Sequence, residues 1–138
     1  PQNFRESALL DRFHCFIEGW LLPRVNDSMI FKGWTINVEY FSEVLHTMRI
    51  QNTYSLLFDK ITKFEEKADV RDSKAIKRMA TAYMKLLFPH WDKEEEVDKE
   101  AFDLYCLQPA LHRRGIVKEQ CHYIDSEFKA RMPEVWIK

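Results

Sequence analysis

Residues 73–89 read SKAIKRMATAYMKLLFP and carry the clearest secondary-structure pattern in the chain. Apolar side chains recur there every three or four residues, at Ile76, Met79, Ala80, Tyr83 and Leu87. This spacing places them on one face of an α-helix. Asp72 or Ser73 can cap the start of the helix, and Pro89 ends it because proline has no amide hydrogen. We predict a helix whose apolar face, Leu87 included, is buried in a core.

The same spacing recurs on both sides of this segment. The further apolar stripes are Val38, Phe41, Val44, Leu45 and Met48; Tyr54, Leu57, Phe58 and Ile61; Phe102, Leu104 and Tyr105; and Val117, Cys121, Ile124, Phe128 and Met132. Asn37 and Asp98 precede two of these stripes and are residue types that cap helices. The helix after Asp98 is predicted to run to Pro109. The last helix is predicted to begin near Pro109 or His112 and to end at Pro133.

Residues 13–17, FHCFI, are the best strand candidate because they are short and rich in aromatics. Gly19 and Pro23 interrupt regular structure after them, and residues 24–36 are predicted to be irregular. The fold class is therefore mainly α, a helical bundle preceded by one strand or extended arm. We expect residues 1–20 to be poorly ordered, packed as an arm on the bundle, or paired with a second copy.

Length and composition restrict the function. The 138 residues are 46% hydrophobic, which suits one domain with a packed core. The chain has only three glycines, which argues against a barrel, a sandwich or a complete phosphate-binding loop. A net charge of -1 implies no bulk attraction to nucleic acid or membrane, and no apolar run is long enough to span a bilayer.

The cysteines and histidines indicate no metal site. Cys15, Cys106 and Cys121 are widely spaced and odd in number, which favours free thiols in a reducing compartment and a cytoplasmic location. The five histidines form no HxxxH or HExxH spacing and no CxxC motif exists, so no bound metal is predicted. The chain begins without methionine, and we expect it to be an excised piece of a longer protein.

Three charged features have two interpretations each. In SALLDRF (7–13), Asp11 and Arg12 are either a surface ion pair or present an arginine to a neighbouring subunit's phosphate. In LHRRGIVKEQ (111–120), Arg113 and Arg114 stand at a predicted helix start, where the dipole disfavours cations. They either pair with the acidic residues 92–103 or bind an anionic partner.

The third feature is a basic face on the helix of residues 73–88. It consists of Lys74, Lys77, Arg78 and Lys85. This face is either a solvated outer surface or a contact surface for a DNA phosphate backbone.

The first two features together resemble a known family. ALLDRF, HCFIEGW and LLP (8–23) are similar to the stretch of Lon-type AAA+ ATPases in which a P-L-L-D-R box leads into a strand. The DRFH, GW and P elements, with the later RRGIVKEQ, more closely resemble the Lon-related AAA+ proteins of BREX-type phage-defence systems. The chain departs from the Lon pattern at Glu18-Gly19-Trp20, where that family has Pro-Gly-Tyr.

The resemblance implies a function and a domain division. It makes residues 1–24 the end of the large ATPase subdomain and residues 25–138 the helical lid. The lid would contribute to ATP binding and couple hydrolysis to motion of a hexameric ring. ATP and Mg would bind to the full-length parent, and this fragment alone would bind neither and hydrolyse nothing. The phosphate-binding loop would lie upstream, since the chain has no GxxxxGK[ST] motif.

The resemblance also assigns individual residues. Arg12 falls on the arginine-finger position, which acts on a neighbouring subunit's nucleotide. Arg114, or failing that Arg113, falls on the sensor-2 position of the lid. Because their partners would be phosphates, Arg12 and Arg114 are expected to be exposed and to lack strong internal carboxylate partners. The alternative is a free-standing helical module that binds protein or DNA through the basic face of residues 73–88.

Overall fold

The computed structural model describes residues 6–138, which belong to two compact units. Unit 1 combines the N-terminal residues up to Phe16 with Asn52–Lys138, and unit 2 is Ile17–Gln51. The boundary expected between residues 24 and 25 therefore lies inside unit 2. Among the described residues, no helix is both long and apolar enough to cross a membrane.

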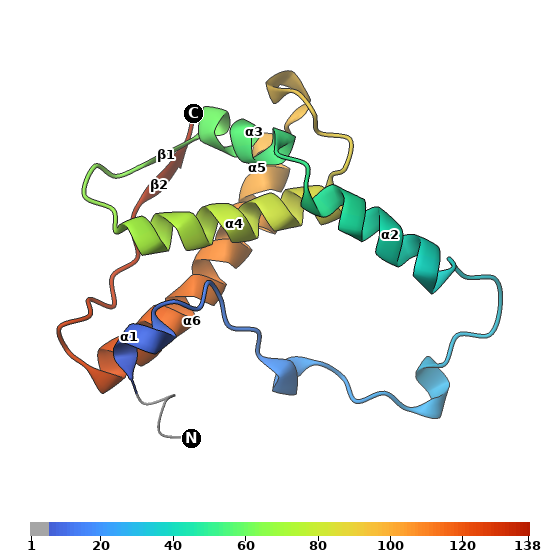
Figure 1. The fold of residues 1–138 in the computed structure, drawn as a ribbon, viewed down its shortest axis with the longest axis horizontal. Coiled ribbons are helices and arrows are strands. Elements are labelled where there is room, and N and C mark those ends of the chain that lie inside the picture. The colour runs from blue at the N-terminus through green and yellow to red at the C-terminus, as the bar shows by residue number, and fades with distance from the viewer. Residues whose placement is uncertain (1–5) are drawn as a thin grey trace. The chain divides into compact units, whose positions relative to one another are not determined.

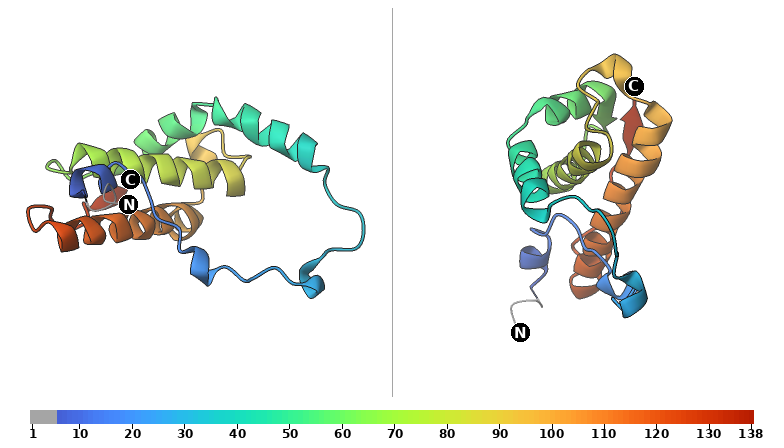
Figure 2. Two further views of the ribbon diagram at one scale, coloured as in Figure 1. Left: turned by 60° about the horizontal axis from the view of Figure 1, so that its bottom comes forward. Right: turned by 90° about the vertical axis from the view of Figure 1, so that its right-hand side faces the viewer.

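Unit 1 is a helical bundle, which confirms the predicted fold class (Figure 1). Its helices are α1 (Ser7–Leu10), α3 (Thr53–Ile61), α4 (Val70–Leu87), α5 (Lys99–Phe102) and α6 (Gln108–Ile124). Helices α3 and α6 both pack on α4. Figures 1 and 2 both show α1 against the C-terminal half of α6. There the Ser7 hydroxyl donates to the Asp125 carboxylate over 3.3 Å.

Helix α3 has the predicted buried face. All four predicted side chains of its stripe are buried, namely Tyr54, Leu57, Phe58 and Ile61. Phe58 is fully buried, and its ring meets the Phe102 ring edge-on with the centroids 6.0 Å apart. The stripe therefore joins α3 to α5 and to the core of the bundle.

Helix α4 begins earlier than predicted, and of its predicted stripe Ile76 and Ala80 are buried, Met79 and Tyr83 pack partly buried on the core, and only Leu87 lies outside. Its cap is Asp69, whose side chain accepts from the Arg71 amide over 2.7 Å, so Asp72 and Ser73 lie inside the helix. Ile76, Ala80 and Met84 are each 0% exposed, but Leu87 is 51% exposed. The burial predicted for Leu87 is wrong, because the buried line advances by four residues at a time and leaves the last residue outside it.

Residues 99–124 of unit 1 form one continuous helical segment. Asp98 caps α5 as predicted and accepts from the amides of Glu100 and Ala101 over 2.9 and 3.1 Å. A π-helical turn, Asp103–Leu107, then leads directly into α6. Pro109 does not end the helix; it is the second residue of α6 and follows directly on the π-helical turn.

Helix α6 ends at Ile124 rather than at the predicted Pro133. Asp125 has an extended backbone with φ at -147°, and its carbonyl accepts from the Phe128 amide in a turn. Phe128 and Met132 therefore lie beyond the helix. Met132 nevertheless packs on the core, partly buried, from this non-helical segment.

The strand prediction for residues 13–17 is wrong. The sheet of the described chain has two antiparallel strands, β1 (Thr62–Phe64) and β2 (Val135–Ile137), with Lys63 opposite Trp136. Residues 11–16 are instead an arm on α6, where the Phe16 amide donates to the Arg113 carbonyl over 3.2 Å. A packed arm is one of the three arrangements that were expected for the N-terminal residues.

Unit 2 consists of α2 (Val38–Arg49) and an irregular segment before it. Asn37 caps α2 as predicted, since its side chain accepts from the amides of Glu39 and Tyr40. Residues 24–36 are irregular apart from one short 3-10 turn, Asp27–Met29. No residue of unit 2 is buried, and Trp34 is fully exposed.

Candidate functional site

One predicted site residue, Arg114, lies at the centre of a buried charge cluster. The Arg114 side chain is 0% exposed and lies in α6. Its Nε donates to Oδ1 of Asp72 over 2.9 Å, and its Nη2 donates to Oδ1 of Asp11 over 2.5 Å. A guanidinium with fixed, planar donors suits two carboxylates that arrive from different helices.

Asp72 holds Arg114 from the side of α4. This carboxylate is 2% exposed, and Nη2 of Arg114 lies 2.8 Å from its Oδ1. Its other oxygen accepts from the ammonium group of Lys118, one turn further along α6. Two cations therefore balance the buried Asp72, which satisfies the requirement that a buried charge be paired.

Asp11 joins the same cluster from the end of α1. Its second oxygen accepts from the guanidinium of Arg71 on α4. Burial alone would raise the pKa of the Asp11 carboxyl, but hydrogen bonds from Arg71 and Arg114 outweigh burial and lower that pKa below 3.8. Asp11 is therefore a stable anion that joins the arm to both long helices.

Arg114 also holds the backbone on both sides of Arg12. Its Nη1 donates to the Asp11 carbonyl over 3.0 Å and to the Phe13 carbonyl over 2.6 Å. Arg12 lies between these two carbonyls, and its side chain is exposed. The exposure expected for Arg12 is thus confirmed, and its main chain is fixed by the neighbouring peptide groups.

The exposure expected for Arg114 is wrong, and so is the expected absence of carboxylate partners. The argument from the helix dipole also fails, because α6 begins at Gln108 and follows a π-helical turn without a break. Nor do the acidic residues 92–103 neutralise Arg114. Its partners are Asp72 and Asp11, which local sequence patterns could not identify because they lie 42 and 103 residues away.

Arg113 lies beside the cluster but has a different environment. Its side chain is half-buried, and its Nε is buried without a hydrogen-bond partner among the described residues. A buried donor without a partner is unfavourable by about 1–3 kcal/mol. The Nε of Arg113 is therefore a donor that the described residues leave unsatisfied.

The predicted basic face of α4 is partly paired within the protein. Lys77 forms an ion pair with Asp59 over 2.5 Å. Nη1 of Arg78 lies 3.0 Å from Nε2 of His14, a contact that needs a neutral imidazole because the guanidinium can only donate. Burial, with the charges of Arg78 and Arg114, lowers the pKa of His14 below 6.5. Binding of DNA through this face stays a prediction.

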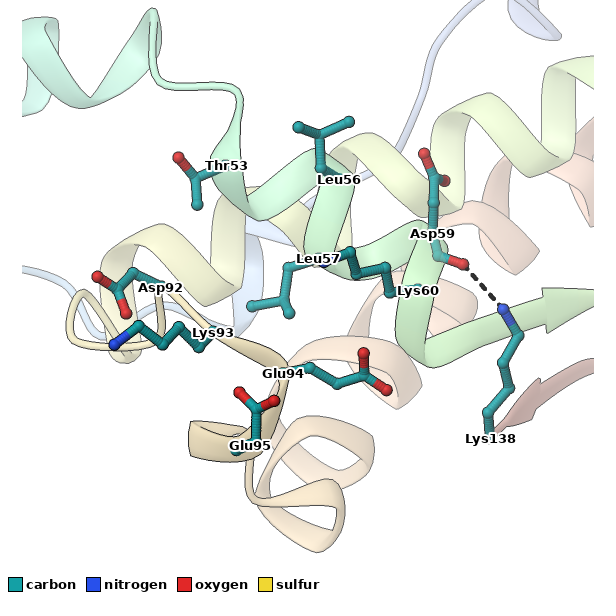
Figure 3. A pocket seen from close by; sticks show the side chains of 10 residues that line it. All are labelled: Thr53, Leu56, Leu57, Asp59, Lys60, Asp92, Lys93, Glu94, Glu95 and Lys138. Carbon is teal, nitrogen blue, oxygen red and sulfur yellow. Dashed lines mark hydrogen bonds between the residues drawn. The ribbon is translucent and has the colours of Figure 1, made fainter.

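The thiols and a surface pocket beside α3 carry no predicted chemistry. All three cysteines are free, and burial raises the pKa of the Cys106 thiol to about 12. Within residues 6–138, no cluster of histidine, cysteine and carboxylate side chains could hold a metal ion. Figure 3 shows a pocket between α3 and residues 92–95 whose lining mixes lysines with carboxylates, and where Lys138 donates to the Asp59 carbonyl. It contains none of the predicted site residues.

Comparison with known proteins identifies the family. Residues 1–134 match the family described as "Lon-like protease BrxL-like, ATPase domain". The chain belongs to this family of Lon-like ATPase domains, which confirms the resemblance found in the sequence.

Two curated relatives are named Lon-like protease BrxL. The protein of Escherichia coli O9:H4 (strain HS) is 28% identical over 120 residues, which are 87% of this chain and 16% of the relative. The protein of Bacillus cereus (strain H3081.97) is 29% identical over 115 residues, 83% of this chain and 16% of the relative. The chain therefore spans about one sixth of the length of these relatives.

Proposed function

We propose that this chain is part of a Lon-type, ATP-dependent, protease-like AAA+ protein of a phage-defence system. Its helical bundle contributes the lid of the ATPase module. In the full-length parent the lid caps the nucleotide and couples hydrolysis to motion of a hexameric ring in the cytoplasm. By itself the chain is inactive.

The observation that carries this proposal is the state of Arg12. Family membership supports an ATPase role. Arg12 has an exposed guanidinium on a backbone held at the carbonyls before and after it. An always-charged group on a fixed backbone is suited to stabilise the charge that develops on a transferred phosphoryl group. We assign Arg12 the role of an arginine finger toward the neighbouring subunit.

The sensor position is better filled by Arg113 than by Arg114. All three guanidinium nitrogens of Arg114 already bind protein groups, so it would have to leave the cluster to reach a phosphate. Arg113 has the unpartnered buried Nε described above. In this assignment Arg113 faces the phosphates of ATP in its own subunit and Arg12 faces those in the neighbouring subunit, whereas the phosphate-binding loop and the Mg ligands belong to other parts of the parent. When bound, ATP supplies the scissile phosphoanhydride and Mg neutralises its charge.

The finger assignment is tested in the full-length ATPase. Arg12→Ala should lower kcat for ATP by about 10³-fold, the lower end of the range for such arginines, without changing the folded fraction. Arg24→Ala is the control, because Arg24 is also an exposed arginine. Normal turnover in Arg12→Ala would overturn the assignment.

The lid assignment has a separate test on the isolated chain. Without a phosphate-binding loop, this chain should bind ATP too weakly to detect by calorimetry at micromolar concentrations. A micromolar dissociation constant would contradict the proposal that the nucleotide is held mainly by other parts of the parent.

A further inference from the structure

We propose that Arg114 is a positioning residue for Arg12, through which the packing of α4 and α6 determines where the Arg12 guanidinium lies. This inference rests on the proposed function, because it assumes that Arg12 acts on a nucleotide. It gives Arg114 a role other than phosphate sensing.

The first step is the attachment of the arm. The Arg114 side chain binds the arm at three atoms, which are the carbonyl oxygens of Asp11 and Phe13 and Oδ1 of Asp11. The Asp11 carbonyl belongs to the peptide plane just before Arg12, and the Phe13 carbonyl belongs to the plane just after Phe13, so one guanidinium holds the backbone on both sides of the Arg12–Phe13 pair. An arginine in a flexible loop would lack this restriction and would sample many directions.

The second step is the attachment of Arg114 itself. Two nitrogens of Arg114 lie 2.8 and 2.9 Å from Oδ1 of Asp72, a residue of α4. Lys118 of α6 binds the other oxygen of the same carboxylate. Because the Arg114 side chain is 0% exposed, its position is determined by α4 and α6 and not by solvent.

The third step is the consequence for coupling. Arg71 and Asp72 are consecutive residues of α4, and both bind the cluster that contains Asp11. A shift of α4 relative to α6 would separate Asp72 from Arg114 or carry Arg114 away from the arm. Either change alters the carbonyl contacts next to Arg12. The cluster thus joins the helical bundle of one subunit to the arginine that faces the next subunit.

The experiment is a double-mutant cycle in the full-length ATPase with Arg114→Lys and Arg12→Ala. Lysine keeps the positive charge beside Asp72 and Asp11 but has a single nitrogen, so it cannot bridge both carboxylates and both carbonyls. Arg114→Lys should lower kcat by about 10- to 100-fold, the effect of a small misplacement of a catalytic group. The KM for ATP and the Kd for a non-hydrolysable ATP analogue should stay unchanged.

The cycle separates positioning from a structural role. If Arg114 acts through Arg12, Arg114→Lys should cause no further loss of the hydrolysis rate when Arg12 is already alanine. Single-turnover experiments measure this rate directly. Leu107→Ala is the control for destabilisation alone, because Leu107 is 1% exposed and belongs to the hydrophobic core rather than to the charge cluster. It should keep kcat within about twofold of wild type below its unfolding temperature.

The outcomes distinguish this inference from the proposed function. Additive losses in the double variant, or a raised KM with normal kcat, would overturn the positioning role while leaving Arg12 as the finger. Normal kcat in Arg12→Ala alone would overturn the proposed function and the inference with it. If Arg114→Lys does not fold, Asp11→Asn replaces it, because this change keeps the Arg114–Asp72 pair. Asp11→Asn should lower kcat in the same non-additive way, and an unchanged kcat would again overturn the inference.

Discussion

Two arginines in this chain show how strongly environment decides the role of a residue. Arg12 and Arg114 each stand next to another charged residue in the sequence, Asp11 and Arg113 respectively, yet one is exposed and the other is 0% exposed. Burial of Arg114 is possible because Asp72 and Asp11 supply two carboxylates at hydrogen-bond distance. Removing one member of such a buried group leaves an uncompensated charge, which is far more costly than losing a surface ion pair.

The buried cluster gives a stability prediction for Asp72. Asp72→Ala should lower the free energy of unfolding of the 138-residue chain by about 3–5 kcal/mol, because Arg114 would stay buried without its main partner. Lys74→Ala, on the exposed side of the same helix, should change it by no more than about 0.5 kcal/mol. Urea denaturation measures both values, and equal midpoints for the two variants would contradict the assignment of Asp72 to the core.

Asp11 gives a pH prediction. An unfolded Asp11 binds a proton near its ordinary pKa of 3.8, whereas the folded residue does so only at lower pH. The stability that Asp11 contributes is therefore complete above pH 3.8 and is lost as the pH falls through the lowered folded-state pKa. Urea unfolding of wild type and Asp11→Asn from about pH 6 to pH 3 should show a stability difference that shrinks on acidification. A constant difference would mean that Asp11 is not held as an anion.

At the scale of elements, the caps of α2 and α5 and the buried face of α3 were predicted correctly, whereas the cap of α4 is Asp69 rather than Asp72 or Ser73. Asn37 and Asp98 cap α2 and α5 as their sequence positions indicated. A cap depends on a side chain and amides two or three residues away, which the sequence places next to each other. The face that a helix buries depends on its neighbours, and for α4 the buried line ran through Ile76, Ala80 and Met84 rather than to Leu87.

The corrected face of α4 can be tested with two substitutions. Met84→Ala should cost about 2–5 kcal/mol of unfolding free energy, because Met84 is 0% exposed and its loss leaves a cavity. Leu87→Ala should cost about 0.5 kcal/mol or less, since the leucine is already half-exposed. Thermal or urea unfolding provides the comparison. A larger loss of unfolding free energy for Leu87→Ala than for Met84→Ala would instead support the buried face predicted from the sequence.

At the scale of the whole molecule, the two units differ in how much apolar surface each one buries within itself. Unit 1 has a core that joins α3, α4, α5 and α6. Unit 2 has no buried residue, and most of its large apolar side chains, Trp34 among them, are exposed. Most of the stability of a helix in a protein comes from burying its apolar face, so α2 lacks the support that α4 has.

This difference predicts the pattern of amide hydrogen exchange in the 138-residue chain. Amides of α2 should exchange at least about 100-fold faster than those in the middle of α4, because α2 opens without breaking a core. Exchange followed by mass spectrometry or NMR would resolve the two helices. Equal protection of both would show that unit 2 has packing interactions as strong as those of unit 1.

The sequence by itself determined the helical class, the caps at Asn37 and Asp98, the buried stripe of α3 and the resemblance to Lon-like ATPases. These features depend on residues a few positions apart or on short motifs, so they can be predicted from the sequence alone. Only the tertiary structure decided the pairing of β1 with β2, because strands of three residues are too short to show an alternating pattern. It alone also decided that Arg114 is buried while Arg12 is exposed. The partners of Arg114 are 42 and 103 residues away, and only the packing of α1, α4 and α6 brings these charges together.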